Sequence, residues 1–280
     1  MPAGGGSRGA LYNDAPMQPL LNTAVQAARR AGDIAVRALS RLDQLEIRAK
    51  ARNDYVTQVD QAAEQAILES IRKRYPDHAF LAEESGRSGD NEFTWIVDPL
   101  DGTTNFLHGF PTFSVSIALR RKDTLEVAVV YDPCRQELFT AMRGRGAQLD
   151  GKRIRVSERT ELEGTLIGTG FPFRSNTRWM KPYLKMLGSV METTAGVRRP
   201  GSAALDLSYV AAGRLDGFFE FGLEIWDTAA GTLMIQEAGG LVTNLTGTGS
   251  HLESGDVLAG NPKVHDALRE LLTPHLNGAP

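Results

Sequence analysis

The chain has 280 residues, 41% of them hydrophobic and 23% charged, which is enough to bury a sizeable core in one large or two small domains. A formal net charge of −3 gives no general reason to expect nucleic acid as the main partner. The only cysteine, Cys134, excludes an intrachain disulfide and a zinc site built from thiolates. With no apolar run of membrane-spanning length, we expect a cytoplasmic protein without a membrane span.

Residues 1–16 are rich in Gly, Ala and Pro and lack the apolar segment of a signal peptide. We expect them to be a disordered leader, an expression remnant or an early start. Apolar residues then recur with helical spacing from 18 to 42, which predicts a helix that packs on a core.

The next segments predict a short strand at 46–48, a polar loop at 50–54 and a second helix that ends near residue 75. Asp60 precedes that helix and is a candidate N-cap, a role that stabilises a helix by about 1 kcal/mol. A short apolar strand at 79–82 ends in Glu83 and Glu84. Adjacent side chains point to opposite sides of a strand, so only one of the two glutamates can face a given site.

The stretch from Trp95 to Phe106 is the first with a chemical signature. Its apolar start predicts the end of a buried strand, with Asp98 at that end and Pro99 stopping the ladder of hydrogen bonds. Asp101 and Gly102 follow, and then Thr103, Thr104 and Asn105 at a predicted helix start. Two carboxylates beside free backbone N–H groups suit a metal-bridged phosphate, although an acidic turn closed by glycine has the same pattern.

The rest of the chain divides into two kinds of pattern. Alternating segments at 113–120, 126–132 and 137–142, with a turn at Asp150-Gly151, predict antiparallel strands. After them, strands and helices alternate, as in an α/β layer. The predicted elements are strands at 166–170, 216–221, 241–242 and 257–259, a loop at 171–173, and helices at 179–188, 201–213 and 262–272.

A second chemical signature runs from Trp226-Asp227-Thr228 into an Ala-rich helix that ends at Gly239-Gly240, with Asp227 as its predicted N-cap. The two signatures, in this order, resemble those of the inositol monophosphatase family, and most closely of its bacterial SuhB-type members. The resemblance extends from about Met17 to Leu272. It implies an α+β / α/β layered sandwich (α-β-α-β-α) of the sugar-phosphatase type: one catalytic domain at 17–280, with sub-layers at about 17–150 and 151–280.

The resemblance implies Mg²⁺-dependent, lithium-sensitive hydrolysis of myo-inositol 1-phosphate by a homodimer. Glu83, Asp98 and the Leu100 carbonyl would hold one Mg²⁺, and Asp98, Asp101 and Asp227 a second. All-oxygen ligation fits this metal. The catalytic roles fall to Asp60, Thr103 and Glu83, with Thr103 hydrogen-bonded to Asp60 and orienting the attacking water.

The resemblance also implies the residues on the substrate side. The backbone N–H groups of Gly102 and Thr103 would face the phosphate. The other substrate contacts would be Arg198, Gly201, Ser202, Ala203, Glu220 and Asp227. Arg199 is an adjacent competitor for the role of Arg198, and Arg198 is otherwise an ordinary surface charge. Lys50 resembles a lysine on the family's mobile metal loop and is otherwise a solvated charge.

Other functions fit parts of the pattern. The spacing Asp98-x-x-Asp101 excludes an aspartyl-phosphate phosphatase, which needs Asp-x-Asp. Fructose-1,6-bisphosphatase, nucleotide 3′-phosphatase and histidinol-phosphatase activities share the metal motif, whereas Glu220 favours a polyol. SuhB-type proteins are also associated with transcription antitermination by RNA polymerase and with ribosome maturation. Basic clusters that fit such a surface, or are simply solvated, are Arg72-Lys73-Arg74, Arg120-Arg121-Lys122 and Arg143 with Arg145.

Overall fold

The computed structural model describes residues 17–45, 47–51, 54–172, 177–248 and 250–276. The predicted leader at 1–16 lies outside these residues. For strand β1 and the first two residues of β2 only the backbone is described, so the role expected of the Lys50 side chain also lies outside them. None of the described helices is both long and apolar enough to cross a bilayer.

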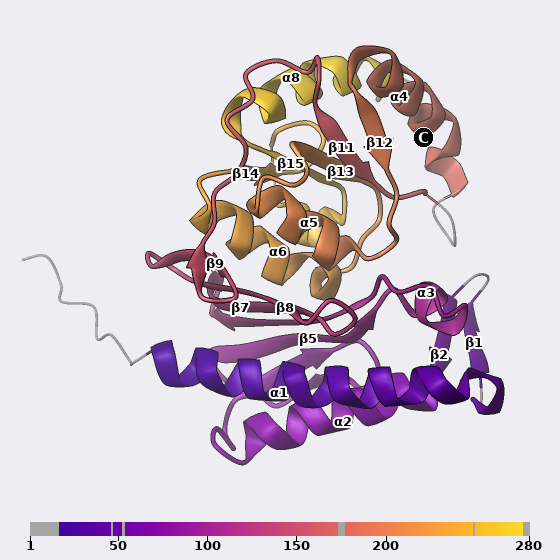
Figure 1. Ribbon diagram of the computed structural model, residues 1–280. Helices are drawn as coiled ribbons and strands as arrows, with labels where there is room; N and C mark the ends of the chain where they lie inside the picture. Colours follow the sequence, from indigo (N-terminus) through magenta and orange to yellow (C-terminus); the bar gives the residue numbers. More distant parts are fainter. Residues whose placement is uncertain (1–16, 46, 52–53, 173–176, 249, 277–280) are drawn as a thin grey trace, which may run out of the picture.

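Two antiparallel helices, α1 (Met17–Ala38) and α2 (Gln58–Arg72), form the first layer (Figure 1). The predicted helix at 18–42 is confirmed as α1, continued by a 3₁₀ helix, Leu39–Gln44. Five of its alanines, Ala24, Ala27, Ala28, Ala31 and Ala35, are fully buried. Small side chains allow the helix to approach α2 and the sheet below closely. The layer covers one face of an eight-stranded sheet.

The eight-stranded sheet has the order β10-β9-β8-β7-β6-β5-β3-β4 and is antiparallel except for the pair β3 and β5. Its strands are β3 (Ala79–Ala82), β4 (Gly86–Ser88), β5 (Phe93–Asp101), β6 (Ser114–Arg121), β7 (Thr124–Asp132), β8 (Glu137–Met142), β9 (Gly146–Leu149) and β10 (Lys152–Arg153). The predicted strands of this half and the turn at Asp150-Gly151 are confirmed. Strand β4 was not predicted, because it is only three residues long.

The strand β5 continues past the point where Pro99 was expected to end it. It reaches Asp101, which pairs with Ser114 of β6, after a register irregularity between Asp98 and Asp101. Pro99 falls inside this irregularity. On the other side, β3 pairs only as far as Val97, so the missing N–H of Pro99 leaves no ladder bond broken there.

The second half forms a five-stranded mixed sheet with the order β12-β11-β13-β15-β14. Its strands are β11 (Leu166–Thr169), β12 (Gly196–Arg198), β13 (Gly217–Glu220), β14 (Leu241–Thr243) and β15 (Val257–Gly260). Helices α5 (Ala203–Ala211) and α6 (Ile225–Glu237) lie between the two sheets, and α4 (Met180–Thr193) and α8 (Pro262–Leu272) cover the outer face (Figure 1). The predicted layered α-β-α-β-α fold is confirmed.

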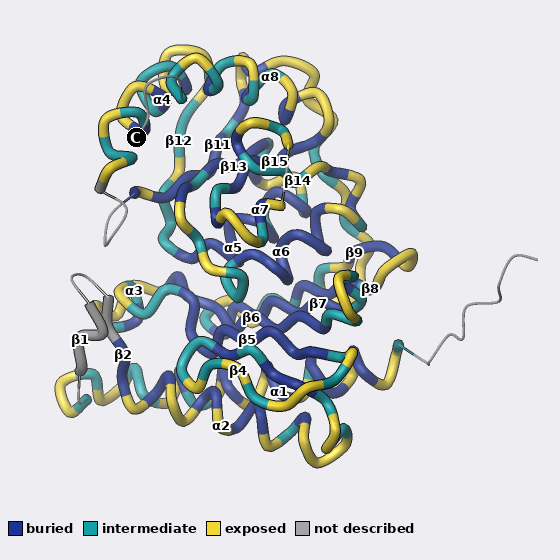
Figure 2. The backbone as a smooth tube through the Cα atoms, turned by 180° about the vertical axis from the view of Figure 1, so that it is seen from behind, coloured by how far each residue is buried: buried dark blue, intermediate teal, exposed yellow. Residues whose placement is uncertain are grey.

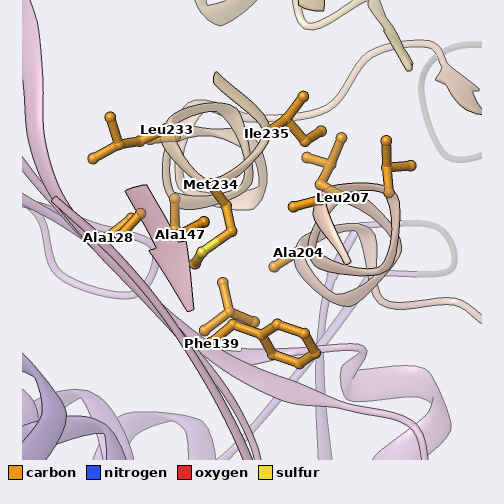
Figure 3. Packing of buried hydrophobic residues seen from close by; sticks show 14 of the residues in the cluster. Ala128, Phe139, Ala147, Ala204, Leu207, Leu233, Met234 and Ile235 are labelled. Atoms are coloured by element: carbon orange, nitrogen blue, oxygen red, sulfur yellow. The ribbon is translucent and has the colours of Figure 1, made fainter. Parts of the chain in front are cut away.

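Helices α5 and α6 are buried on almost all sides because a sheet covers each face of their layer (Figure 2). Figure 3 shows Leu233, Met234 and Ile235 of α6 among side chains of the large sheet and of α5. One continuous cluster of buried residues therefore joins both sheets. This packing fixes the N-terminal ends of α5 and α6 relative to β5.

Three local predictions are corrected. Of the polar loop expected at 50–54, residues 50–51 and 54 belong instead to the antiparallel strands β1 (Ile47–Ala51) and β2 (Asp54–Thr57), and 52–53 lie outside the described residues. Both expected N-caps are wrong by three residues: Thr57 caps α2 and Glu224 caps α6, while Asp60 and Asp227 are the third residues of their helices. The sequence alone did not distinguish the N-cap position from the N3 position, because an acidic residue is suited to either position of a capping box.

Candidate active site

Three aspartates meet at the carboxyl end of β5. Asp98 and Asp101 belong to the strand, and Asp227 comes from the first turn of α6. Each places one carboxylate oxygen within 4.8 Å of the others, and Asp98 and Asp101 are buried. The strand and the helix belong to different layers, so only the folded chain brings the three together.

Burial raises the pKa values of the carboxylates in the cluster, and their repulsion of one another adds to this shift. Burial raises the pKa of Asp98 well above its usual value, and the nearby Glu83, Asp101 and Asp227 raise it further. Burial likewise raises the pKa of Asp101 to about 6 and that of Asp227 well above normal, with Glu83 adding to both. The predicted grouping of Glu83 with the aspartates therefore agrees with its electrostatic effect. Such a site has to take up protons or cations at neutral pH.

Hydrogen bonds from the backbone fix each aspartate. Asp98 Oδ1 accepts the Leu100 N–H at 2.9 Å, and Asp227 Oδ2 accepts the Glu224 N–H at 2.8 Å. Asp101 Oδ2 accepts the Ala204 N–H at 2.8 Å, at the start of α5. Each carboxylate is thus held through one oxygen while it offers an oxygen to the cluster.

Asp60 is fully buried and joins α2 to the site. Its Oδ2 accepts the backbone N–H of Thr57 at 2.8 Å and the Thr57 hydroxyl at 2.6 Å, which completes the cap of α2. Its Oδ1 accepts the hydroxyl of Thr103 at 3.1 Å, which confirms the expected hydrogen bond. The Leu100 carbonyl also lies 3.1 Å from the Thr103 hydroxyl. A hydroxyl has a single hydrogen to donate, so the Thr103 O–H can rotate to point at either of these two acceptors, but at only one of them at a time.

Gly102 allows the tight turn between the strand and the short helix α3 (Thr103–Leu107). Its φ of 101° lies in the left-handed region, which favours glycine. A Cβ atom at this position would also lie 3.1 Å from the carbonyl oxygens of Gly201 and Thr112. The turn therefore touches the segment that was expected to bind substrate.

Glu220 ends strand β13 and lies directly against Gly170. A Cβ atom on Gly170 would fall inside the Glu220 carboxylate, so only glycine leaves room for it. Sequence reasoning selected Glu220 but missed Gly170, because the contact joins the residue after β11 to the end of the neighbouring strand β13. The contact fixes where the Glu220 carboxylate lies at the end of β13, while its expected substrate role stays a prediction.

The structure brings Arg199, rather than Arg198, to the rim of the site. Arg198 is exposed, and its guanidinium donates to the carbonyl of Val197. The guanidinium of Arg199 lies over the ring of Phe171 at 5.1 Å and comes within 2.8 Å of where a Gly201 Cβ would be. The role expected of Arg198 therefore suits Arg199, which the sequence left open as its competitor.

Ser202 and Ala203 are buried, and Ser202 uses its side chain within the protein. Its hydroxyl donates to Asp101 at 2.6 Å and lies 3.1 Å from the hydroxyl of Ser114. The side chain of Ser202 therefore supports Asp101 from within the protein. Ser114 was missed because no local pattern distinguishes it from other strand residues.

Asp206, on α5, is a further buried carboxyl group that sequence reasoning missed. Burial raises its pKa well above normal; Glu220 and Asp101 raise it further, and Arg199 lowers it. Its Oδ1 has no hydrogen-bond partner within the described part of the chain. It lies inside an apolar helix, where the sequence gives no signal of a site.

Comparison with known proteins agrees with this geometry. A sequence profile of the inositol monophosphatase family matches residues 16–277. The chain is 56% identical over 265 residues to Nus factor SuhB of Pseudomonas aeruginosa, covering 93% of this chain and 98% of the relative. It is 50% identical over 265 residues to Nus factor SuhB of Escherichia coli K12, with 94% and 99% covered.

Solved structures show the same architecture. The extragenic suppressor protein SuhB of Bartonella henselae is similar with a TM-score of 0.88 and 46% identity, over 91% of this chain and 98% of that one. An IMPase of Thermotoga maritima is similar with a TM-score of 0.85 and 33% identity, over 94% and 100% of the two chains.

Proposed function

Because this chain belongs to the inositol monophosphatase family, we propose that it is a Mg²⁺-dependent phosphatase that hydrolyses myo-inositol 1-phosphate. The observation that carries the proposal is the cluster of Asp98, Asp101 and Asp227. Their raised pKa values reflect a site that is short of positive charge. Glu220, the last residue of β13, offers a carboxylate that could accept hydrogen bonds from hydroxyl groups, and this supports a polyol substrate.

The donor set fits Mg²⁺, a hard cation that prefers oxygen ligands. Glu83, Asp98 and the Leu100 carbonyl would hold one ion, and Asp98, Asp101 and Asp227 a second. When bound, Mg²⁺ supplies positive charge that lowers the pKa of water and stabilises the leaving alkoxide. The same cations would relieve the repulsion between the buried carboxylates.

The other residues bind and orient. Thr103, with Asp60 behind it at 3.1 Å, holds the attacking water through its hydroxyl. The N–H groups of Gly102 and Thr103 face the phosphate at the start of α3. Glu220, with Arg199 and the turn at 201–203, would contact the hydroxyl groups of the ring.

A substrate panel tests the proposal directly. Phosphate release is measured from myo-inositol 1-phosphate, fructose 1,6-bisphosphate, a nucleotide 3′-phosphate and histidinol phosphate. We expect the first to have the highest kcat/KM, with activity lost in EDTA, restored by Mg²⁺ and reduced by LiCl. The Asp98→Asn variant serves as the inactive control. Faster turnover of another substrate would overturn the substrate assignment, and activity in EDTA would overturn the role of the metal.

We also propose a role alongside transcription, because the two relatives named above are both called Nus factors. The exposed Arg143 and Arg145, at the turn between β8 and β9, would contribute to a partner surface. The test is a pull-down with the Asp98→Asn variant, which separates binding from catalysis, followed by detection of RNA polymerase subunits. Enrichment should fall when Arg143 and Arg145 are replaced by Glu. Absence of RNA polymerase from the pull-down would remove this role.

We expect a cytoplasmic homodimer. The outer face of α4 would form its interface. Leu184 and Met191 on this helix are 56% and 63% exposed, and Phe171 beside it is 44% exposed. A groove of about 470 Å³ between α4 and β12 adds to this apolar surface. Light scattering should give the mass of a dimer for the wild type and a lower mass for Met191→Glu. A monomeric wild type would contradict the proposal.

A further inference from the structure

The candidate site is assembled from two segments that lie almost a hundred residues apart. The strand β5 and the helix α3 supply Asp98, Asp101 and Thr103, and the turn before α5 supplies the residues expected to face substrate. One side chain of α3, Asn105, connects them. Its Nδ2 atom donates to the carbonyl of Thr112 at 2.7 Å and to that of Pro200 at 2.8 Å. The carbonyl of Gly201 lies 3.4 Å from the same atom.

The chemistry of these contacts selects asparagine. A carboxamide nitrogen carries two hydrogens, so it can donate to the Thr112 and Pro200 carbonyls at the same time. An aspartate of the same shape offers only acceptors and would face three carbonyl oxygens. Asn105 therefore donates two hydrogen bonds at once, one to the turn at Pro200 and one to the segment after α3.

The turn fits against Asn105 only because residue 201 is a glycine. Gly201 has a φ of 93°, and a Cβ there would come within 2.9 Å of Asn105 Nδ2 and 2.8 Å of Arg199 Nη1. The amide of Asn105 and the guanidinium of Arg199 thus both lie close to the same Cα. A shift of the turn would move Arg199 and the backbone groups at 201–203 together.

A second set of hydrogen bonds between the segments involves the charged carboxylate of Asp101. Asp101 accepts hydrogen bonds from Ser202 and Ala204 while it also contributes to the carboxylate cluster. Asn105 is neutral, and its contacts do not involve the cluster. Resting on the proposed function, we propose that Asn105 is a positioning residue that sets the substrate turn at 199–203 and so favours substrates with ring hydroxyl groups.

The test compares Asn105→Asp and Asn105→Ala with the wild type on two substrates. Myo-inositol 1-phosphate has ring hydroxyls, and p-nitrophenyl phosphate has none. Misplacement of a contact by about 1 Å commonly reduces activity by up to about 100-fold. We expect KM for myo-inositol 1-phosphate to rise about 10-fold or more, with kcat/KM for p-nitrophenyl phosphate and the Mg²⁺ concentration for half activation within about 2-fold of wild type. Asn22→Asp, on the exposed side of α1, controls for the added charge.

Hydrogen exchange provides a readout that needs no turnover. The amides at 199–204 should exchange faster in both variants, while those of α2 keep their protection. If the wild type does not hydrolyse myo-inositol 1-phosphate, the proposed function fails, but the exchange result still decides whether Asn105 positions the turn. Equal losses on both substrates, unchanged kinetics, or unchanged exchange at 199–204 would each overturn the inference. Should Asn105→Asp not fold, Asn105→Ala gives the same comparison.

Discussion

At the scale of single residues, Asp60 makes two sets of hydrogen bonds, and mutagenesis has to distinguish their effects. One carboxylate oxygen completes the cap of α2, and the other accepts the Thr103 hydroxyl. Burial raises the pKa of this carboxyl group, and the hydrogen bonds from Thr57 oppose that shift. Replacing Asp60 therefore changes both the cap of α2 and the proposed orientation of water, whereas replacing Thr103 leaves the cap in place.

We expect Thr103→Val to lower kcat by about 100-fold or more, the usual scale for loss of a positioned proton-transfer partner. Its Mg²⁺ dependence should stay near wild type, because every proposed metal ligand remains. Its free energy of unfolding should fall by about 1–3 kcal/mol, because the buried Asp60 Oδ1 loses its donor. Asp60→Asn should lower kcat similarly and also reduce the free energy of unfolding by about 1 kcal/mol through the weakened cap. Steady-state kinetics of the double variant should show little further loss. Multiplied losses would mean that the two residues act separately.

At the scale of elements, the contact between α5 and α6 depends on Gly231. A Cβ at this position would lie 2.4 Å from Cβ of Leu207, so Gly231→Ala forces the helices apart. Overpacking of this kind reduces the free energy of unfolding by about 1–3 kcal/mol. The shift should also raise the Mg²⁺ concentration needed for activity, since the two helices position Asp101 and Asp227.

Gly188→Ala in α4 is the matched control. A Cβ there would have no neighbour within 4 Å, so we expect stabilisation by about 0.4–1 kcal/mol. Urea unfolding of the two variants measures the difference. Equal effects of the two substitutions would show that the spacing of α5 and α6 is not restrictive.

The contact of α7 (His251–Ser254) with α6 introduces a pH dependence. His251 Nε2 lies 2.9 Å from the Thr232 hydroxyl, and burial lowers the pKa of His251 to about 4. In the unfolded chain the imidazole takes up a proton near its ordinary pKa of 6.5. The stability due to the neutral imidazole is therefore fully present above pH 6.5 and is lost as the pH falls towards 4.

We expect His251→Gln to reduce the stability lost between pH 7 and pH 4.5 by about 2–3 kcal/mol relative to wild type, from the size of the pKa difference. Urea unfolding at the two pH values gives this difference. The titration of the aspartates affects both proteins equally and cancels. An identical pH dependence in the variant would show that His251 has the same pKa in the folded and the unfolded chain.

At the scale of the whole molecule, the carboxylate cluster brings β5 of the large sheet and α6 of the middle layer together, and the like charges of its three aspartates repel one another. At pH 7.5, Mg²⁺ should raise the melting temperature, because a ligand at 100 times its Kd stabilises the folded state by about 2.7 kcal/mol. For a chain of this size, that corresponds to about 5 °C or more. Sodium chloride of equal ionic strength is the control for screening.

The Asp98→Asn variant should differ from the wild type both without and with the metal. Without metal it should melt above the wild type, since one of the buried like charges is gone. With Mg²⁺ it should gain less than the wild type. Differential scanning calorimetry measures both shifts, and an equal gain in the two proteins would contradict a metal site at this cluster.

Local patterns in the sequence determined much of this protein. The helical stripe of α1, the alternation in β6 to β8 and the two acidic signatures depend on neighbouring residues only, so they could be predicted without a structure. The hydrogen bond between Asp60 and Thr103 and the grouping of the aspartates came from the family resemblance. The geometry agrees with both.

Only the tertiary structure decided how these parts meet. The N3 positions of Asp60 and Asp227, the course of β5 beyond Pro99 and the different contacts of Arg198 and Arg199 depend on which groups are already paired in the fold. The contacts of Asn105 with Pro200 and of Gly170 with Glu220 join residues that are distant in the chain. Such contacts are fixed by the packing of α5 and α6 between two sheets, and no periodicity in the sequence records that packing.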